Sequence, residues 1–194
     1  MGKIALSQSY SLDGVMQAPG GPDEDGRSGF EHGGWAMEYD FNYAEEVGLE
    51  QAQNADALLL GRFTYDVLQG YWPKQEGEFA ERLNELPTYV VSSTLTDPGW
   101  NATVLGDDWP EKVARLRKEL DGDIVVYGSR RLSQALIRLG LVDELRLMVY
   151  PLVLGSGDRL FEETQETIPL RLVESRPLGD GVVNMIYAPA TADE

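Results

Sequence analysis

Hydrophobic residues along the chain fall into two patterns, short apolar runs and longer stretches with helical spacing. Short runs bounded by turn residues are typical of buried strands, whereas apolar residues three and four positions apart are typical of a helix that buries one face. The runs predict strands at residues 3–10, 57–60, 88–91, 102–105, 124–127, 145–154, 170–176 and 182–188. The helical spacing predicts helices at residues 42–55, 64–69, 78–85, 109–120 and 130–139.

The order of these elements predicts the fold class. Strands alternate with helices through most of the chain, which indicates an α/β fold with a mainly parallel sheet flanked by helices. Residues 179–181 read Gly-Asp-Gly between the last two strands, so we expect an antiparallel hairpin at the edge of the sheet. Gly70 and Gly140 are expected to end helices, and Asp108 is expected to cap one.

Residues 11–40 contain no predicted strand or helix and are rich in Gly, Pro and Asp. A structureless segment of this length in a compact domain is usually functional or mobile. Its aromatic residues, and those just past it, could pin the segment to the core or wall a pocket for a flat, ring-shaped substrate. Trp35 and Phe41 are the candidates for substrate contact.

Composition limits the classes of function. With 194 residues the chain fits one domain, which we expect over residues 1–190 with a tail at 191–194. The net charge of −17 argues against sequence-independent nucleic-acid binding, because phosphate contacts need a basic surface. The chain has no cysteine, which excludes disulfides and thiolate zinc sites, and no metal site is expected. Neither a signal-peptide pattern nor a membrane-length apolar run is present, so we expect a soluble cytoplasmic protein.

Small and polar residues follow three of the predicted strands, and ligands bind at the carboxyl ends of strands in α/β sheets. A small residue there lets a phosphate approach backbone N–H groups and the positive end of a helix dipole. The candidates for cofactor binding are Gly61, Arg62 and Thr64, then Ser92 and Ser93, and then Gly128, Ser129, Arg130 and Arg131. Plainer explanations are open: Thr64 or Ser129 could cap its helix, and the serine pair could belong to an ordinary polar loop.

Several motifs together resemble a known family. They are SLDG at residues 11–14, DALLLGRFTY at 56–65, GLVDEL at 140–145 and YPLVLG at 150–155. The first and the last two are similar to the reductase, C-terminal domain of the bifunctional riboflavin-biosynthesis deaminase–reductase, and the second resembles the cofactor motif of dihydrofolate reductases. The chain thus resembles a stand-alone member of the dihydrofolate reductase superfamily over about residues 3–188. The resemblance implies a three-layer α/β/α fold.

The resemblance also implies roles for individual residues. NADPH is the implied cofactor, and the turn at Asp13 and Gly14 would lie near its nicotinamide and the substrate. Gly14 would allow close approach of the cofactor, while Asp13 would orient the substrate or stiffen the loop. A carboxylate on the helix after the long loop would donate a proton, and Glu45 lies nearest the expected spacing. The family commonly pairs through its sheet, so a homodimer is expected.

The implied activity is NADPH-dependent reduction of 5-amino-6-(5-phosphoribosylamino)uracil in riboflavin biosynthesis, a hydride transfer to a pyrimidine- or pterin-type small molecule. Tyr127 stands where these reductases usually carry an acidic residue, which leaves the substrate open. The alternatives are dihydrofolate reductase activity and an NADP-binding module without turnover. The preference for NADPH over NADH is also open, because the partner of the 2′-phosphate could be Ser93, Arg130 or Arg131.

Overall fold

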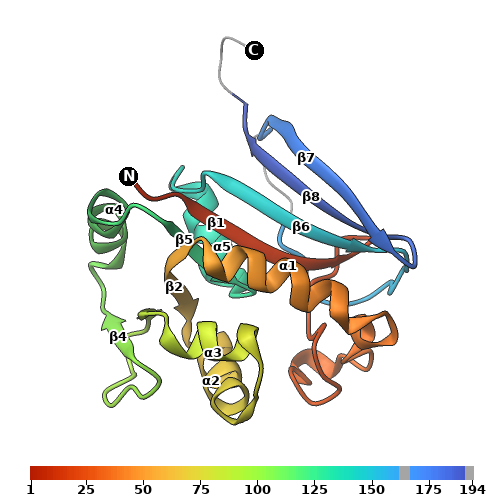
Figure 1. Cartoon of the computed structure of the whole chain (residues 1–194), viewed down its shortest axis with the longest axis horizontal. Helices are drawn as coiled ribbons and strands as arrows, with labels where there is room; N and C mark the ends of the chain where they lie inside the picture. Colours follow the sequence, from red (N-terminus) through yellow and green to blue (C-terminus); the bar gives the residue numbers. More distant parts are fainter. Residues whose placement is uncertain (162–166, 191–194) are drawn as a thin grey trace.

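One sheet runs through the computed structural model, with its strands in the order β4-β3-β2-β5-β1-β6-β8-β7 (Figure 1). The structure describes residues 1–161 and 167–190, and of residue 41 it describes only the backbone. The predicted tail at 191–194 lies outside the described residues. The strands are β1 (Ile4–Ser11), β2 (Ala55–Gly61), β3 (Thr88–Val91), β4 (Ala102–Leu105), β5 (Asp123–Tyr127), β6 (Glu144–Tyr150), β7 (Leu170–Gly179) and β8 (Val182–Pro189).

The strand directions confirm the predicted mixed sheet. The first six strands in this order, from β4 to β6, are parallel to one another. β8 is antiparallel to both β6 and β7, so the last two strands form the predicted hairpin at one edge. Parallel strands in this order place their carboxyl ends along one side of the sheet, where α/β folds bind ligands.

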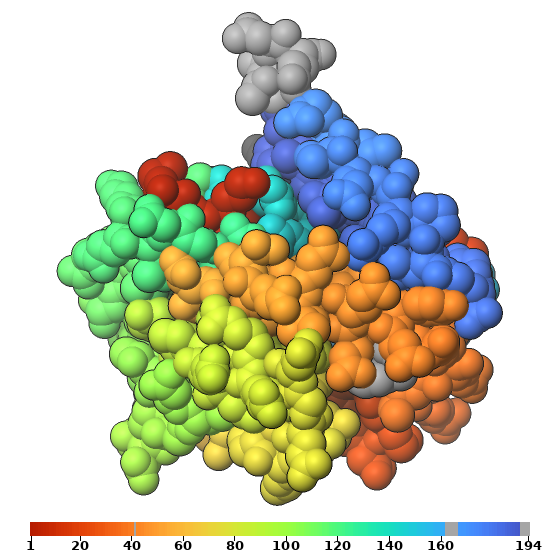
Figure 2. Space-filling view, viewed as in Figure 1, coloured from red at the N-terminus to blue at the C-terminus, as the bar shows by residue number. Residues whose placement is uncertain are grey.

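Helices cover both faces of the sheet, which confirms the three-layer arrangement. The α-helices are α1 (Phe41–Gln53), α2 (Arg62–Tyr71), α3 (Glu78–Glu85), α4 (Trp109–Glu119) and α5 (Arg130–Arg138). On one face Ala52, Tyr65 and Leu83 from α1, α2 and α3 share an apolar cluster with β2. On the other face Val113 and Leu136 from α4 and α5 share a cluster with β1. In the space-filling view α1 and α3 form a continuous layer over the sheet (Figure 2).

Some predicted element limits were wrong. α2 continues through Gly70 to Tyr71, because packing of Trp72 on Phe79, with ring centroids 4.9 Å apart, outweighs the cost of about 1 kcal/mol for a helical glycine. β6 ends at Tyr150, four residues earlier than predicted, because Pro151 has no N–H to donate to a neighbouring strand. Asp108 does not cap α4 through its side chain; its carboxylate pairs with Lys112 at 2.8 Å.

The segment at residues 11–40 is held by the core rather than left open. It contains two short 3₁₀-helices, η1 (Arg27–Gly29) and η2 (Trp35–Glu38), and a third, η3 (Trp72–Lys74), follows α2. Trp35 packs edge-on against Tyr150 of β6, and its indole N–H donates to the carbonyl of Gln17 at 2.8 Å. The segment therefore forms a wall beside the carboxyl ends of β1 and β6. No helix within the described ranges is long and apolar enough to cross a membrane.

Candidate active site

A cavity of about 460 Å³ opens at the carboxyl ends of β2 and β5 and continues beneath α1 to the floor of the sheet. The helices α1, α2 and α5 and the segment at residues 11–40 supply its walls. Most of the predicted cofactor residues line it, namely Gly61, Arg62, Thr64, Gly128, Ser129, Arg130 and Arg131. Gly14, Ser92 and Ser93 do not line it.

The turns that follow β2 and β5 are bonded to each other at the cavity. The Gly61 N–H donates to Ser129 Oγ at 3.0 Å, and the Ser129 N–H donates to Thr64 Oγ1 at 3.0 Å. Ser129 stands at the N-cap position of α5, as the plainer interpretation expected, but its side chain makes no cap hydrogen bond. Thr64 lies within the first turn of α2, whose N-cap is Gly61, and α2 has no side-chain cap either. Because β2 and β5 are neighbours, the first turns of both helices present N–H groups to the same space.

Backbone strain is concentrated at one of these turns. Gly128 and Ser129 are both left-handed, each with φ near +51°. Serine rarely adopts this conformation, and holding it costs on the order of 1 kcal/mol. The cross-strand hydrogen bonds to Gly61 and Thr64 hold Ser129 in place. Strain of this kind is typical of binding sites, where the surrounding structure fixes an unfavourable backbone.

The arginines at the mouth of the cavity have different ion-pair partners. Arg62 Nε lies 2.7 Å from Asp66 one helical turn along α2, and Arg130 Nη2 lies 3.0 Å from Asp158. Arg131 is exposed and has no ion-pair partner among the residues the structure describes. Among the described residues no carboxylate compensates the charge of Arg131, so this side chain suits an anionic ligand.

Asp13 lies outside the cavity and anchors the loop after β6 instead. It accepts hydrogen bonds from Ser11 Oγ at 2.7 Å and from the backbone N–H groups of Leu154 and Gly155, and it pairs with Arg159 at 2.9 Å. Desolvation acts to raise the pKa of Asp13, but the hydrogen bonds from Ser11, Leu154 and Gly155 outweigh it and hold the pKa well below its usual range. Asp13 is therefore ionised, and both oxygens of its carboxylate are bound by neighbouring groups of the chain.

Of the remaining predicted site residues, those whose side chains the structure describes are also found outside the cavity. Glu45 is half-buried and lies near Gly77, at the start of α3, and Ser92 Oγ accepts the N–H groups of Thr94 and Leu95 in a local turn. Gly14 is left-handed, with φ of +83°, in the turn beside Arg159. Trp35 is a core residue, only 4% exposed, and Phe41 lies outside the described side chains.

Sequence reasoning missed a carboxylate that the fold brings to the cavity. Glu24, from the long segment, lines the cavity and accepts the Gly20 N–H at 2.6 Å. Burial raises the pKa of Glu24; the hydrogen bond from Gly20 opposes the rise, and the charge of Asp25 adds to it. A half-buried carboxyl with a raised pKa can hold a proton at higher pH than an exposed one, which suits proton transfer.

A cation–π contact joins the long segment to α2 across the cavity. The guanidinium of Arg27 lies 3.7 Å from the centroid of the Phe63 ring, and Arg27 also pairs with Asp25 at 2.7 Å. Such contacts stabilise by about 0.5–1 kcal/mol at exposed sites. No sequence pattern signals this contact, because Arg27 and Phe63 belong to elements that meet only in the fold.

Comparison with known proteins identifies this architecture. The family model described as "RibD C-terminal domain" matches residues 3–184, nearly the whole chain. The chain belongs to this family. The RibD C-terminal domain family is also the one that the motifs resemble, so the predicted family is confirmed.

Relatives and solved structures agree with the family. The chain is 30% identical over 191 residues to the uncharacterized protein YyaP of Bacillus subtilis, covering 95% of this chain and 94% of YyaP. A putative riboflavin biosynthesis protein from Shewanella sp. PV-4 superposes with a TM-score of 0.75 at 19% identity, covering 98% of this chain and all of that one. A dihydrofolate reductase from Enterococcus faecalis, complexed with NADP(H), has a TM-score of 0.62 at 14% identity and 97% coverage of both chains. These structural likenesses show a dihydrofolate reductase-like fold for this RibD C-terminal domain family member.

Proposed function

We infer that the protein is an NADPH-dependent reductase that transfers a hydride to a pyrimidine- or pterin-type small molecule. The observation that carries this inference is the pair of uncapped helix N-termini, α2 and α5, which meet at one cavity through the bonds between Gly61, Thr64 and Ser129. Unpaired N–H groups at helix N-termini bind phosphate groups, and a dinucleotide carries two of them in its bridge. Membership of the RibD C-terminal domain family supports the same function.

The residues of the cavity mouth fit such a cofactor. Gly61 and Gly128 carry no side chain that would block the backbone, so a pyrophosphate can approach both turns. Arg62 would neutralise part of its charge from the first turn of α2. Arg131 lacks an ion-pair partner among the described residues, so it would bind the 2′-phosphate that distinguishes NADPH from NADH.

The remaining part of the cavity would position and protonate the substrate. When bound, NADPH supplies the hydride, while the protein aligns the substrate and excludes water. Glu24 would hold the proton, because it lines the cavity and its pKa is raised. Asp13 and Glu45 are not in a position to do so, and we assign the proton donor to Glu24 in their place.

Two experiments test the function. The first is calorimetric titration of the protein with NADPH and with NADH, where tight binding of NADPH alone is expected. The second follows NADPH oxidation spectrophotometrically while 5-amino-6-(5-phosphoribosylamino)uracil or dihydrofolate is added. Turnover with the first substrate supports a riboflavin-pathway reductase, and turnover with the second supports the alternative dihydrofolate reductase. Cofactor binding without turnover on any pyrimidine or pterin would leave the alternative of a binding module.

A homodimer stays a prediction, and we propose that it would form through β7. β7 is the outer strand of the sheet, and its Leu172 and Val173 are each about half exposed. An edge strand with exposed apolar side chains can add a strand from a second copy. Light scattering on the protein and on a Leu172→Lys variant tests this, with dimer expected for the first and monomer for the second. A cytoplasmic location likewise stays a prediction from composition.

A further inference from the structure

Four polar residues line the cavity where α1 faces the sheet, and we call this part of the cavity the polar recess: Ser7, Gln51, Tyr127 and Arg146. Ser7 on β1 pairs with Tyr127 on β5 and with Arg146 on β6, so these three lie in one row across the sheet. α1 forms the roof, since Tyr127 Oη donates to the carbonyl of Gly48 at 3.5 Å. A polar floor is unusual in a buried layer between a helix and a sheet, because unpaired polar groups are costly there.

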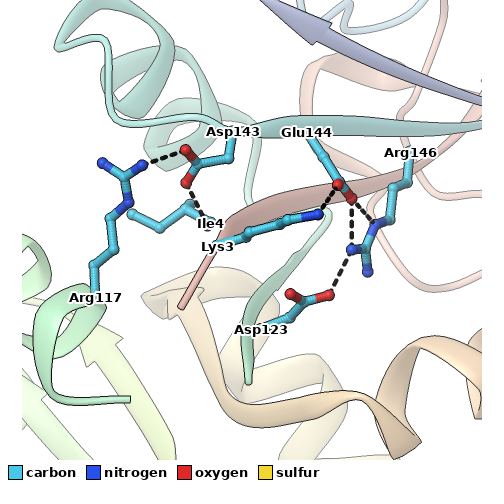
Figure 3. A network of polar contacts seen from close by, with 7 residues as sticks. All are labelled: Lys3, Ile4, Arg117, Asp123, Asp143, Glu144 and Arg146. Atoms are coloured by element: carbon cyan, nitrogen blue, oxygen red, sulfur yellow. Dashed lines mark hydrogen bonds and ion pairs between the residues drawn. The ribbon is translucent and has the colours of Figure 1, made fainter. Parts of the chain in front are cut away.

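Arg146 is held rigidly at this recess by two carboxylates (Figure 3). It is 8% exposed, and its Nη2 donates to Asp123 at 2.5 Å and to Glu144 at 2.6 Å, while Nε donates to Glu144 at 3.0 Å. Its third nitrogen, Nη1, has no hydrogen-bond partner among the described residues. Arg146 therefore lines the cavity with one end fixed and one donor group unused.

The charges around Arg146 cancel. Lys3 Nζ pairs with Glu144 at 2.6 Å, so two cations face the two carboxylates Asp123 and Glu144 (Figure 3). The neighbouring pair of Arg117 and Asp143 is neutral by itself. A ligand group in the recess would thus meet a directional donor without a net positive charge, which favours an uncharged acceptor over an anion.

Gln51 supplies the complementary acceptor from α1. It is 8% exposed, and its Oε1 is buried with no hydrogen-bond partner among the described residues. Gln51 and Arg146 line the same cavity. The end of α1 is also tied to the strand that holds Arg146 in place: the backbone carbonyl of Asn54, the C-cap of α1, accepts the Asp123 N–H at 3.0 Å, and the Asp123 carboxylate binds Arg146. A buried carbonyl left without a donor costs about 1–3 kcal/mol, so a partner in the native complex is expected.

We propose that Gln51 Oε1 and Arg146 Nη1 together bind the adjacent N–H and C=O groups along the edge of an uncharged lactam ring of the substrate. The substrate carbonyl accepts from Arg146, and the substrate N–H donates to Gln51. A phosphate has no N–H to offer Gln51 and finds no net positive charge here, so this end of the cavity selects against phosphorylated groups. The proposal rests on the proposed reductase function and names the residues that set its substrate specificity.

The test uses lumazine, a fluorescent bicyclic lactam, and 1,3-dimethyllumazine, whose two pyrimidine-ring N–H groups are blocked. Both are titrated at a pH where they are uncharged, with and without saturating NADP⁺, and binding is followed by fluorescence. Gln51→Leu removes the acceptor while keeping a side chain of similar size. Gln53→Leu changes an exposed glutamine on the same helix and is the matched control. Arg146 is left unchanged, because its removal would leave the carboxylates of Asp123 and Glu144 without this cation and would strongly destabilise the protein.

The wild-type protein is expected to bind lumazine about tenfold more tightly than the dimethyl compound, because only lumazine can form the buried hydrogen bond to Gln51. Gln51→Leu should abolish this discrimination by weakening lumazine binding alone, while Gln53→Leu should retain it. Inorganic phosphate should not compete with lumazine when NADP⁺ fills the cavity mouth.

The proposal would be overturned by equal binding of both compounds, by discrimination that survives Gln51→Leu, or by competition from phosphate. Absence of lumazine binding in a protein that binds NADP⁺ would also overturn it and would leave the reductase function standing. Absence of NADP⁺ binding would instead count against the reductase function itself. A separate titration of the protein with NADP⁺ alone distinguishes the two outcomes.

Discussion

Ser129 and Thr64 lie 65 positions apart in the sequence, yet the Ser129 N–H donates to Thr64 Oγ1 at 3.0 Å. The bond ties the turn after β5 to the first turn of α2. It also holds Ser129 in a left-handed conformation that serine seldom adopts. The geometry of the candidate cofactor site therefore depends on a side chain from each of two neighbouring strand ends.

Replacing Thr64 with valine should disturb both stability and cofactor binding. Valine keeps the shape of threonine but leaves the Ser129 N–H without its acceptor, so we expect a loss of about 1 kcal/mol in the free energy of unfolding. Urea denaturation measures this loss, and calorimetry should show weaker NADPH binding. Thr103→Val, at an exposed position of β4, is the matched control and should change neither quantity. Unchanged NADPH affinity in Thr64→Val would reject the link between this bond and the site.

Two arginines at the mouth should differ in what they recognise. Arg62→Ala should weaken NADPH and NADH binding equally, by about 1.5–3 kcal/mol, because a charged hydrogen bond to the pyrophosphate is lost. Arg131→Ala should weaken NADPH binding by a similar amount and leave NADH binding unchanged, because only NADPH has the 2′-phosphate. Calorimetry with both cofactors measures the effects.

Arg138→Ala, at the exposed end of α5 and away from the cavity, serves as the control for the arginine variants. It should bind both cofactors as the wild type does. If Arg131→Ala lowers the affinity for NADH as much as for NADPH, Arg131 does not bind the 2′-phosphate. Arg130 then becomes the candidate for binding this group.

Much of the fold could be predicted from the sequence because its signals are local. α3, β3 and β4 have the predicted limits, since apolar periodicity and turn residues act within a few positions. The strand ends that line the cavity were predictable for the same reason. Small residues directly after a buried strand indicate the carboxyl edge of the sheet, where ligands bind. Errors arose where tertiary contacts override local preference, as at Gly70.

The roles of individual acidic residues were not predictable, because distant parts of the chain determine them. The partners of Asp13 include Leu154, Gly155 and Arg159, more than 140 positions away, and they make it an anchor. Glu24 lies in a segment without periodicity, and only its burial at the cavity distinguishes it from its neighbour Asp23.

Asp13→Asn tests the anchoring role. The native pKa of Asp13 is lowered from 3.8, so its carboxylate contributes stability that is present above about pH 4 and is lost as the pH falls towards the native pKa. At pH 7 we expect Asp13→Asn to lose about 2 kcal/mol, because a carboxylate with several charged hydrogen bonds becomes a neutral amide. The difference from the wild type should shrink in acid.

Urea denaturation of both proteins at neutral pH and in acid gives this comparison. Asp180→Asn, in the exposed hairpin turn between β7 and β8, should not alter the stability and is the control. A variant as stable as the wild type at pH 7 but inactive would instead restore Asp13 to a catalytic role.

Glu24→Gln tests the proton donor. The raised pKa of Glu24 means that its carboxyl stays protonated to a higher pH than an exposed glutamate, and a donor works only in that form. In the wild type, kcat should therefore fall as the pH rises through the native pKa. Glutamine cannot give up a proton, so Glu24→Gln should lower kcat by about 10²–10⁴-fold and remove this pH dependence, while NADPH affinity stays the same. Asp23→Asn, the exposed neighbour, should keep the wild-type profile. A wild-type pH profile in Glu24→Gln would assign the proton to another group, with solvent water at the cavity mouth as the next candidate.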